Sequence, residues 1–243
     1  MENSVSNNKR VWDKEYSWPE DGEEWNGQAK VCGVPYELWK QSIIDTFFLP
    51  HITNNSVVLE IAPGHGRWTC HLSKLCKKLV VVDLSPNCIE YCKRRFSGCN
   101  NILYYVNDGL SLGMLEDQSI DFIWSFDAFV HMDASVIQSY FYEFKRVLKK
   151  NAKAIIHHGG RNHLSLFLGF LKDLHPNTRK LYRWISMGYS NDDDGWRSVV
   201  SKELVLKMAK KARLTVEKQI QRWGKGNIFG VPRYNDWITI LLQ

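Results

Sequence analysis

The chain has 243 residues, of which 44% are hydrophobic and 24% charged, and its formal net charge is +6 at pH 7. This length suits one α/β domain with a sizeable core. No apolar run reaches the ~18 residues of a membrane-spanning helix, so we expect no membrane partner, and the polar start Met1-Glu2-Asn3-Ser4 lacks the apolar core of a signal peptide.

The basic residues and the cysteines indicate an ordinary surface in a reducing compartment. The cations fall in short clusters such as Lys77-Lys78 and Lys93-Arg94-Arg95, near predicted helix ends, where positive charge is favourable. We therefore expect a solvated surface and no nucleic-acid partner. The six cysteines form no C-x-x-C pair of the metal-binding kind, so we expect reduced thiols in a cytoplasmic protein.

The chain begins with a polar, aromatic-rich segment over 1–34 and continues as a main domain over 35–243. The aromatic residues of the first segment include Trp12, Tyr16, Trp18 and Trp25. In the main domain, helices are predicted over 36–48, 67–76, 86–96, 134–149 and 201–212, the last with Ser201 as N-cap. Strands are predicted over 56–61, 79–83, 102–106, 120–125, 153–158, 214–222 and 237–242. This alternation indicates a doubly wound, mostly parallel sheet whose ligands bind beyond the carboxyl ends of the strands.

A glycine-containing loop follows the first predicted strand. Val57-Val58-Leu59 leads to Glu60, and Gly64 and Gly66 follow before the next helix. Glycine has no Cβ, so the backbone can turn sharply and a ligand can approach closely. Glu60 offers two acceptor oxygens and a negative charge, which suits a cationic ligand. The loop is therefore predicted to bind a nucleotide-type cofactor at a helix N-terminus.

The second predicted strand ends at Asp83, an acid suited to ribose hydroxyls about 20 residues after a glycine loop. Dinucleotide-binding enzymes share this feature, but their loop requires a third glycine, and Thr69 stands at that position here. The loop therefore argues against a dinucleotide.

At this point the chain resembles the class I S-adenosylmethionine-dependent methyltransferases over residues 35–243. The matching stretches are Glu60 to Gly66, Asp83-Leu84-Ser85, Asn107-Asp108-Gly109, Asp121 to Phe126 and Phe144 to Lys149. The resemblance implies a Rossmann-like seven-stranded sheet with an antiparallel last strand, and S-adenosylmethionine as cofactor with S-adenosylhomocysteine as product. The residues it implies around the cofactor are Glu60, Ala62, Gly64, Gly66, Trp68, Asp83, Leu84, Asp108, Gly109, Ser125 and Phe126.

Methyl transfer to a hydroxyl requires alignment of the acceptor and removal of its proton, for which histidine is the natural base. His131 follows the fourth predicted strand, and His157 and His158 end the fifth, so all three are predicted catalytic residues. Adjacent strand residues face opposite ways, and only one of His157 and His158 should therefore point toward the acceptor. His65 and His71 are interpreted as structural.

Two segments outside the shared core are expected to choose the substrate. One is the aromatic segment over 1–34, interpreted either as a lid or as a strap packed on the core. The other is a helical cap predicted over 159–200, which is rich in aromatic and basic residues. The pattern Ser125-Phe126-Asp127 with Val130-His131, then Ile155-Ile156-His157-His158, is similar to that of sugar O-methyltransferases, and so is the aromatic stretch from Trp18 to Trp25. The composition of the cap fits a polar glycan, so the acceptor is expected to be a small polar molecule or a glycan hydroxyl.

Alternatives remain open for the reaction and for a metal. An N-methyltransferase of a small amine, or a non-catalytic module that binds S-adenosylmethionine, would share the fold. A base amino-methylase is disfavoured, because Ser125-Phe126-Asp127-Ala128 stands where its motif would lie. Asp127 or Asp192-Asp193-Asp194 could bind a divalent cation, but no catalytic metal is favoured. The oligomeric state and the acceptor are left open.

Overall fold

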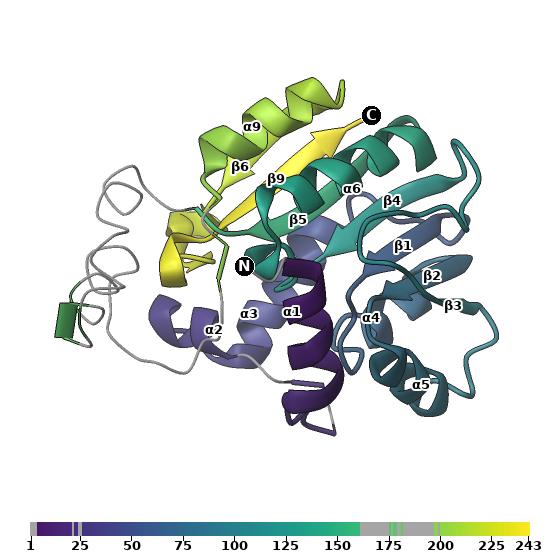
Figure 1. Ribbon diagram of the computed structural model, residues 1–243, viewed down its shortest axis with the longest axis horizontal. Coiled ribbons are helices and arrows are strands. Elements are labelled where there is room, and N and C mark those ends of the chain that lie inside the picture. Colours follow the sequence, from purple (N-terminus) through teal and green to yellow (C-terminus); the bar gives the residue numbers. More distant parts are fainter. Residues whose placement is uncertain are drawn as a thin grey trace.

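The computed structural model describes residues 4–20, 22–23, 26–160, 197–198 and 200–243, together with four isolated positions between 161 and 196. Its centre is a seven-stranded sheet with the order β3-β2-β1-β4-β5-β9-β6 (Figure 1). The strands are β1 Val57–Ile61, β2 Lys78–Asp83, β3 Ile102–Val106, β4 Ile120–Ser125, β5 Leu148–His158, β6 Thr215–Ile220 and β9 Trp237–Leu242. β1 to β5 pair in parallel, whereas β9 runs antiparallel to both β5 and β6. The predicted fold class is confirmed.

Helices cover both faces of this sheet. The main ones are α3 Tyr36–Ile43, α4 Thr69–Leu75, α5 Pro86–Arg95, α6 Ala134–Val147 and α9 Lys202–Lys211. Side chains alternate between the faces along each strand. In β1, Val58 packs with α3, α4 and α5, whereas Leu59 and Ile61 pack with α6 and α9. Burial of β-branched and aliphatic side chains on both faces is the pattern expected of parallel strands.

Local capping groups explain where several helices begin. Ser85 accepts a hydrogen bond from the backbone N–H of Cys88 and precedes Pro86, which is favoured in a first helical turn. Asp133 accepts from the N–H groups of Ser135 and Val136 at the start of α6. Ser201 caps α9 through the N–H of Leu204, as the sequence predicts.

Some predicted ends were wrong by a few residues. β5 begins at Leu148 and α6 ends at Val147, because Leu148 adopts an extended backbone and pairs with Ile120 of β4. The strand predicted over 214–222 divides, since β7 (Arg222–Trp223) leaves the main sheet and pairs with β8 (Phe229–Gly230). The helix predicted over 36–48 continues from α3 as a π-helical turn, η2 (Ile44–Phe48).

The N-terminal segment forms α1 (Ser4–Arg10) and a π-helical turn, η1 (Val11–Glu15), and a short helix α2 (Gly27–Cys32) follows. Figure 1 shows α1 lying across the molecule beside the sheet rather than within either helical layer. Near the last strand, η6 (Arg233–Asn235) is a short 3₁₀ turn, and η3 (Phe129–His131) follows β4. Trp25 and most of the predicted cap over 159–200 lie outside the described residues.

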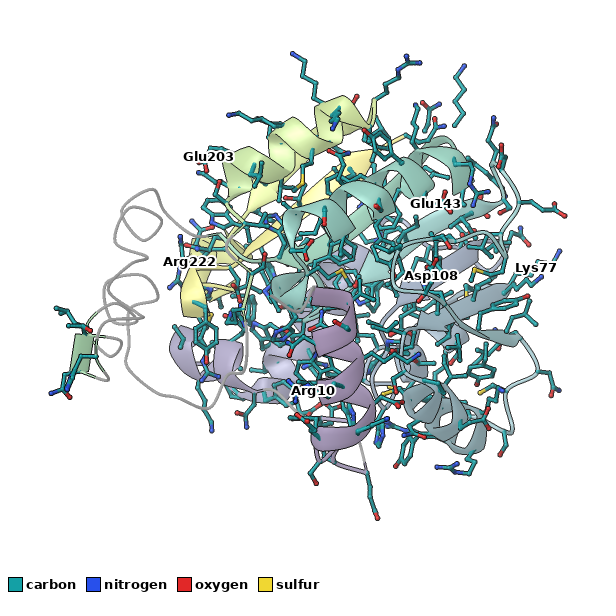
Figure 2. All side chains as sticks on the ribbon, in the orientation of Figure 1. Arg10, Lys77, Asp108, Glu143, Glu203 and Arg222 are labelled. Atoms are coloured by element: carbon teal, nitrogen blue, oxygen red, sulfur yellow. The ribbon has the colours of Figure 1, made fainter. Side chains whose placement is uncertain are left out.

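The exposed basic residues are scattered over the surface, as the sequence indicated. Exposed cations are distributed over several elements, among them Arg10, Lys77 and Arg222 (Figure 2). All six cysteines are free thiols. In the described part of the chain, no helix combines the length and apolar character needed to cross a membrane.

Candidate functional site

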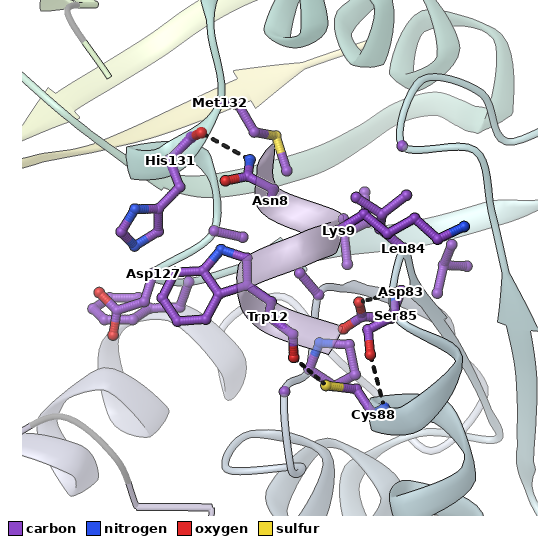
Figure 3. Close-up of a pocket in the computed structure, with 18 of the residues that line it drawn as sticks. Asn8, Lys9, Trp12, Asp83, Leu84, Ser85, Cys88, Asp127, His131 and Met132 are labelled. Atoms are coloured by element: carbon purple, nitrogen blue, oxygen red, sulfur yellow. Dashed lines mark hydrogen bonds between the residues drawn. The ribbon is translucent and has the colours of Figure 1, made fainter. Parts of the chain in front are cut away.

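A cavity of about 920 Å³, its open mouth included, lies at the carboxyl ends of β1, β2 and β4. We call it the first cavity. The glycine loop and the strand ends contribute to its lining, and so do α1, η1 and Trp18; Figure 3 shows Asn8, Lys9 and Trp12 of the N-terminal segment near Asp83 and Asp127. Its lining includes Asn8, Lys9, Trp12, Trp18, Ala62, Gly64, Trp68, Asp83, Leu84, Gly109, Phe126, Asp127 and His131.

The two glycines of the loop are needed for different packing contacts. Both have positive φ, 57° at Gly64 and 92° at Gly66. A Cβ on Gly64 would lie 2.5 Å from the Trp18 ring, so this glycine admits the N-terminal segment over the cavity. A Cβ on Gly66 would lie 2.5 Å from the ring of Phe96, so this glycine lets the loop pack on α5. Gly66 itself does not line the cavity.

Asp83 ends β2 and faces the first cavity as predicted. Its Oδ1 accepts a hydrogen bond of 2.8 Å from the backbone N–H of Ser85. Burial raises the pKa of this carboxyl to about 7. A buried carboxyl of this kind is stabilised in its ionised form when a ligand supplies hydroxyl donors. The two hydroxyls of a ribose are donors of the required type, so this wall fits an adenosyl cofactor.

Trp68 provides a second indication of a ligand. It lines the first cavity, and its indole N–H is buried with no hydrogen-bond partner among the described residues. Such a buried donor is costly unless an acceptor is supplied. An amino-acid carboxylate, as in the methionine part of S-adenosylmethionine, would be an acceptor of this type. The residues present therefore fit the cofactor that the motifs imply.

Other predicted cofactor residues lie outside the described lining of this cavity. Glu60 is buried behind the loop and accepts a 2.6 Å hydrogen bond from the hydroxyl of Thr69. Ser125 donates to the carbonyl of Ile61 at 2.9 Å and so joins β4 to β1. Asp108 is exposed and accepts from the backbone N–H groups of the turn that follows it.

The N-terminal segment is held over the first cavity by specific contacts. Asp13 of η1 accepts hydrogen bonds from the Ser85 hydroxyl at 2.7 Å and from the Asn87 N–H at 3.1 Å, both at the start of α5. The indole N–H of Trp18 donates to the carbonyl of Trp12 at 2.9 Å. The Trp12 ring lies 4.8 Å from the ring of His131 (Figure 3). The segment thus contacts both the cofactor side and the predicted base.

A second cavity of about 430 Å³ adjoins the first. Its lining comes from α2, α3, η3, η6 and the residues before α9, which are far apart in the sequence. The lining residues are Gly27, Gln28, Trp39, Asp127, His131, Arg197, Arg233, Tyr234 and Asp236. Among described residues, only Asp127 and His131 line both cavities. The two therefore mark the junction between them.

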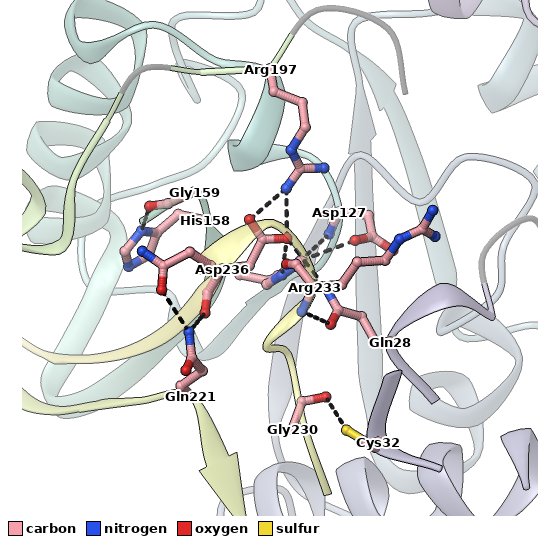
Figure 4. A network of polar contacts seen from close by, with 12 residues as sticks. Gln28, Cys32, Asp127, His158, Gly159, Arg197, Gln221, Gly230, Arg233 and Asp236 are labelled. Atoms are coloured by element: carbon pink, nitrogen blue, oxygen red, sulfur yellow. Dashed lines mark hydrogen bonds and ion pairs between the residues drawn. The ribbon is translucent and has the colours of Figure 1, made fainter. Parts of the chain in front are cut away.

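Five side chains of alternating charge connect the two cavities. Arg67 lies 2.6 Å from Asp127, Asp127 lies 3.1 Å from Nδ1 of His157, and Nε2 of His157 lies 3.3 Å from Asp236. Asp236 is in turn 2.5 Å from Arg197 (Figure 4). Because these groups are largely buried, they are screened less by water than a surface pair would be.

The pKa values along this chain of charges follow from its partners. Burial alone would raise the pKa of Asp127, but Arg67 and His157 outweigh it and hold that pKa well below its usual range. Burial also works against a charged His157, yet Asp127 and Asp236 raise its pKa overall. Asp127 is therefore an ionised carboxylate at the junction. Its φ of 62° is rare for a residue other than glycine and marks a strained position.

The three predicted catalytic histidines have different surroundings. His131 is placed at the junction, consistent with a role toward an acceptor. His157 lies between two carboxylates and lines neither cavity in the described chain. His158 lines neither cavity among the described residues. Its Nδ1 lies 2.6 Å from the Gly159 carbonyl and its Nε2 lies 2.6 Å from the Thr239 hydroxyl. Burial lowers the pKa of His158 to about 4, so it is neutral and structural.

Sequence reasoning missed several residues of this region. Arg67 follows the glycine loop directly, but no motif assigned it a role. Arg197 and Asp236 are separated by 39 positions and are brought together only by the tertiary structure. Asp127 was considered only as a metal ligand. In the described chain, no three His, Cys, Asp or Glu side chains are grouped as a metal site, and Asp192 to Asp194 are outside it.

Comparison with known proteins gives a sequence match and a fold match. Residues 58–151 match the family of methyltransferase domains. No curated protein matches the chain in sequence. An S-adenosylmethionine-dependent methyltransferase from Aquifex aeolicus shares the fold with a TM-score of 0.57 at 16% identity, over 88% of this chain and 95% of its own.

Two further solved structures with this fold differ in the chemistry that their descriptions give. Phosphoethanolamine N-methyltransferase 1 from Haemonchus contortus, bound to phosphoethanolamine and S-adenosylhomocysteine, aligns with a TM-score of 0.58 at 16% identity, over 98% of this chain and 48% of its own. The [4+2]-cyclase SpnF aligns with a TM-score of 0.58 at 12% identity, over 86% of this chain and 80% of its own. The acceptor and the reaction must therefore be argued from the site rather than from the fold.

Proposed function

Because residues 58–151 match a methyltransferase domain and the chain shares the fold of S-adenosylmethionine-dependent methyltransferases, we propose that it methylates a hydroxyl of a small polar acceptor, with His131 as general base. The observation that carries this proposal is the junction of the two cavities at Asp127 and His131. A cofactor in the first cavity and an acceptor in the second would meet at these two residues. Trp39 and Tyr234 line the second cavity, and aromatic rings of this kind suit a sugar.

In this proposal, His131 and Asp127 have different roles at the junction. The cofactor supplies an activated methyl group. Neutral His131 accepts the proton of the acceptor hydroxyl as that hydroxyl attacks, which is the role expected of an imidazole near neutral pH. Asp127 is too weak a base for this role, because its pKa is held low, but its ionised oxygens can accept a hydrogen bond from the acceptor and orient it.

The surroundings keep this chemistry away from water and hold its charges in place. Trp12 covers His131 from the side of the N-terminal segment. Phe126 stacks on His157 with ring centres 4.2 Å apart, and His157 holds Asp127 from behind. His157 is thus a positioning residue in this proposal. A site that excludes water strengthens each of these electrostatic contacts.

N-methylation of a small amine is the second candidate. The observation in its favour is the ionised carboxylate of Asp127, which would bind an ammonium group at the junction. An amine can arrive neutral and needs no strong base, so His131 would then matter less. The two candidates differ in how the rate depends on His131 and on pH.

The test is turnover with an isotope-labelled methyl donor and a panel of sugars, phenols and amines. His131→Ala should lower kcat by ~10²–10⁴ with a hydroxyl acceptor. Binding of S-adenosylhomocysteine should change only a few-fold, because other residues build most of the first cavity. His51→Ala is the matched control, since His51 packs on Phe122 away from both cavities.

The pH profile separates the two candidates. With a hydroxyl acceptor, the wild-type rate should rise with pH through the histidine range, near ~6.5 for an unperturbed imidazole, and this limb should vanish in His131→Ala. With an amine acceptor, the rate of His131→Ala would still rise with pH, because the amine itself deprotonates. A loss smaller than about tenfold together with a surviving limb would show that His131 is not the base.

A further inference from the structure

We infer that the acceptor carries a negatively charged group, a carboxylate or a phosphate, which binds in the second cavity between Arg197 and Arg233. This inference rests on the proposed function, because it identifies the class of molecule that the second cavity admits. The observations behind it are the placement of the two guanidinium groups, the state of the neighbouring carboxylates and the backbone that holds Arg233.

The two arginines converge on one aromatic ring. The guanidinium carbon of Arg197 lies 4.3 Å from the centre of the Tyr234 ring, and that of Arg233 lies 4.7 Å from it. All three residues line the second cavity, and Figure 4 shows both arginines in one network with Asp127 and Asp236. Guanidinium groups are planar forks that match carboxylate and phosphate oxygens. Two of them at one cavity wall form a binding site for an anion.

Among the described residues, the arginines around this cavity outnumber its carboxylates, since Arg67, Arg197 and Arg233 stand against two aspartates. Asp127 already contacts Arg67 and His157, and Asp236 already contacts His157 and Arg197. Each carboxylate thus has two basic neighbours.

Arg197 keeps donors for a ligand. Both of its contacts with Asp236 use the same nitrogen, Nη2. Among the described residues, its Nη1 and Nε donate no hydrogen bond. Its side chain is also mostly buried, with 11% exposed, so the guanidinium does not simply extend into solvent. A ligand oxygen in the second cavity would satisfy these remaining N–H groups.

The backbone around Arg233 is held in an unusual conformation. Tyr234 and Asn235 have φ values of 61° and 58°, in the left-handed region that residues other than glycine rarely adopt. Gln28 of α2 stabilises this turn, because its Oε1 accepts from the Arg233 N–H at 2.9 Å and its Nε2 donates to Asp236 at 3.2 Å. Gly27 lies beside it, and a Cβ there would overlap the Arg233 guanidinium, so a larger residue would displace that side chain.

In this proposal the anionic group binds beside the arginines, and the reacting atom lies at the junction of the two cavities. The arginines and Tyr234 lie toward η6, whereas Asp127 and His131 form the junction with the first cavity. An acceptor anchored by its anion would present a hydroxyl or amine to the junction. Anchoring of this kind restricts the acceptor to orientations in which it can react.

The first experiment measures anion binding to the protein saturated with S-adenosylhomocysteine. The probes are sodium phosphate and sodium acetate, titrated calorimetrically in the millimolar range against potassium chloride at equal ionic strength. At least one probe should bind to the wild type, and the stronger of the two identifies the class of anion. Arg233→Gln should weaken that binding at least tenfold, and Arg222→Gln, an exposed arginine on β7, should leave it unchanged. Binding of neither probe, or equal binding to Arg233→Gln, would overturn the inference.

The second experiment measures turnover, with S-adenosylhomocysteine binding as the control that each variant is folded. Acceptors are compared in matched pairs, such as a neutral sugar and its phosphate or its uronic acid. The anionic member should be preferred, and Arg197→Lys, which keeps a cation beside Asp236, should raise KM at least tenfold with little change in kcat. Unchanged S-adenosylhomocysteine binding shows that each variant is folded.

The outcomes of the two proposals can be told apart. Equal methylation of a neutral acceptor and its anionic partner overturns the anion site but leaves the proposed function intact. Failure to bind S-adenosylhomocysteine, together with no methyl transfer to any acceptor, overturns the proposed function itself.

Discussion

The two cavities meet at the same pair of residues but are built in different ways. The first uses short stretches at consecutive strand ends, such as the glycine loop and Asp83, and its geometry comes mainly from the local backbone. The second joins Gln28, Arg197 and Asp236, which come from three separate parts of the chain. The difference indicates that the first cavity depends on backbone turns, whereas the second depends on ion pairs between distant segments.

Asp236→Asn should produce the largest loss of stability, because Asp236 holds the ion pairs at the second cavity. Removing its charge leaves Arg197 and His157 without a carboxylate partner on that side. Breaking a buried pair typically lowers the free energy of unfolding by ~3–5 kcal/mol. Urea denaturation would measure this loss, and the folded variant should still bind S-adenosylhomocysteine.

Glu217→Gln is the control for Asp236→Asn. Glu217 pairs with Lys153 at a more exposed position on the sheet, and exposed pairs are worth only ~0–1 kcal/mol. A loss of less than about 1 kcal/mol in Asp236→Asn would show that the chain of charges is not important for stability.

Asp83→Ala should act on the first cavity. Two ribose hydroxyls would lose their acceptor, at ~1–3 kcal/mol each, so calorimetry should show at least tenfold weaker binding of S-adenosylhomocysteine. Asp108→Ala is the matched comparison, because the carboxylate of Asp108 is exposed and caps its own turn. Equal losses in the two variants would mean that the cofactor extends to Asp108.

The raised pKa of Asp83 predicts a proton-linked affinity. In the free protein this carboxyl titrates at about 7, and hydroxyl donors from a ribose favour its ionised form. Binding below that pH should therefore release a proton, and affinity should rise with pH by at most tenfold per unit until about 7. Calorimetry in buffers of different ionisation enthalpy would detect the proton. Asp83→Asn should bind without it, and a pH-independent wild type would contradict this account.

Removal of residues 1–15 should have the smallest effect on cofactor affinity and on stability, and it separates a lid from a strap. α1 and η1 line the first cavity and are attached through Asp13 to Ser85 and Asn87. If the segment is a lid, S-adenosylhomocysteine should bind up to about tenfold more weakly, turnover should be lost and the melting temperature should stay within a few degrees of the wild type. A collapse of the melting transition would identify a structural strap instead.

Much of the fold and of the cofactor side could be predicted from the sequence. Buried β-branched strands alternating with helices identify the sheet, and Ser201 identifies a helix start. Gly64, Asp83 and Phe126 were predicted around the cofactor, and all three line the first cavity. Their place in the fold can be predicted because a strand end and the turn after it are local features, set by a few consecutive residues. Their binding of the cofactor stays a prediction.

Predictions of single side-chain directions were less complete. Glu60 was expected at the cofactor, but it lies on the side of β1 that faces α4, where it accepts from Thr69. Only one of His157 and His158 was expected near the acceptor, and the alternation of β5 does place His157 beside Asp127 and His158 beside Thr239. The sequence could not indicate that both nitrogens of His157 would face carboxylates.

By itself, the sequence determined that this chain forms a doubly wound sheet with a glycine loop and an acid at the ends of its first two strands. These features follow from periodicity and from the conformational freedom of glycine, which act over a few residues. Only the tertiary structure decided that Trp18 packs on Gly64, that Asp127 and His131 join two cavities, and that Arg197 meets Asp236. The physical reason is that these contacts join residues far apart in the chain, and ion pairs depend on distances that no local pattern encodes.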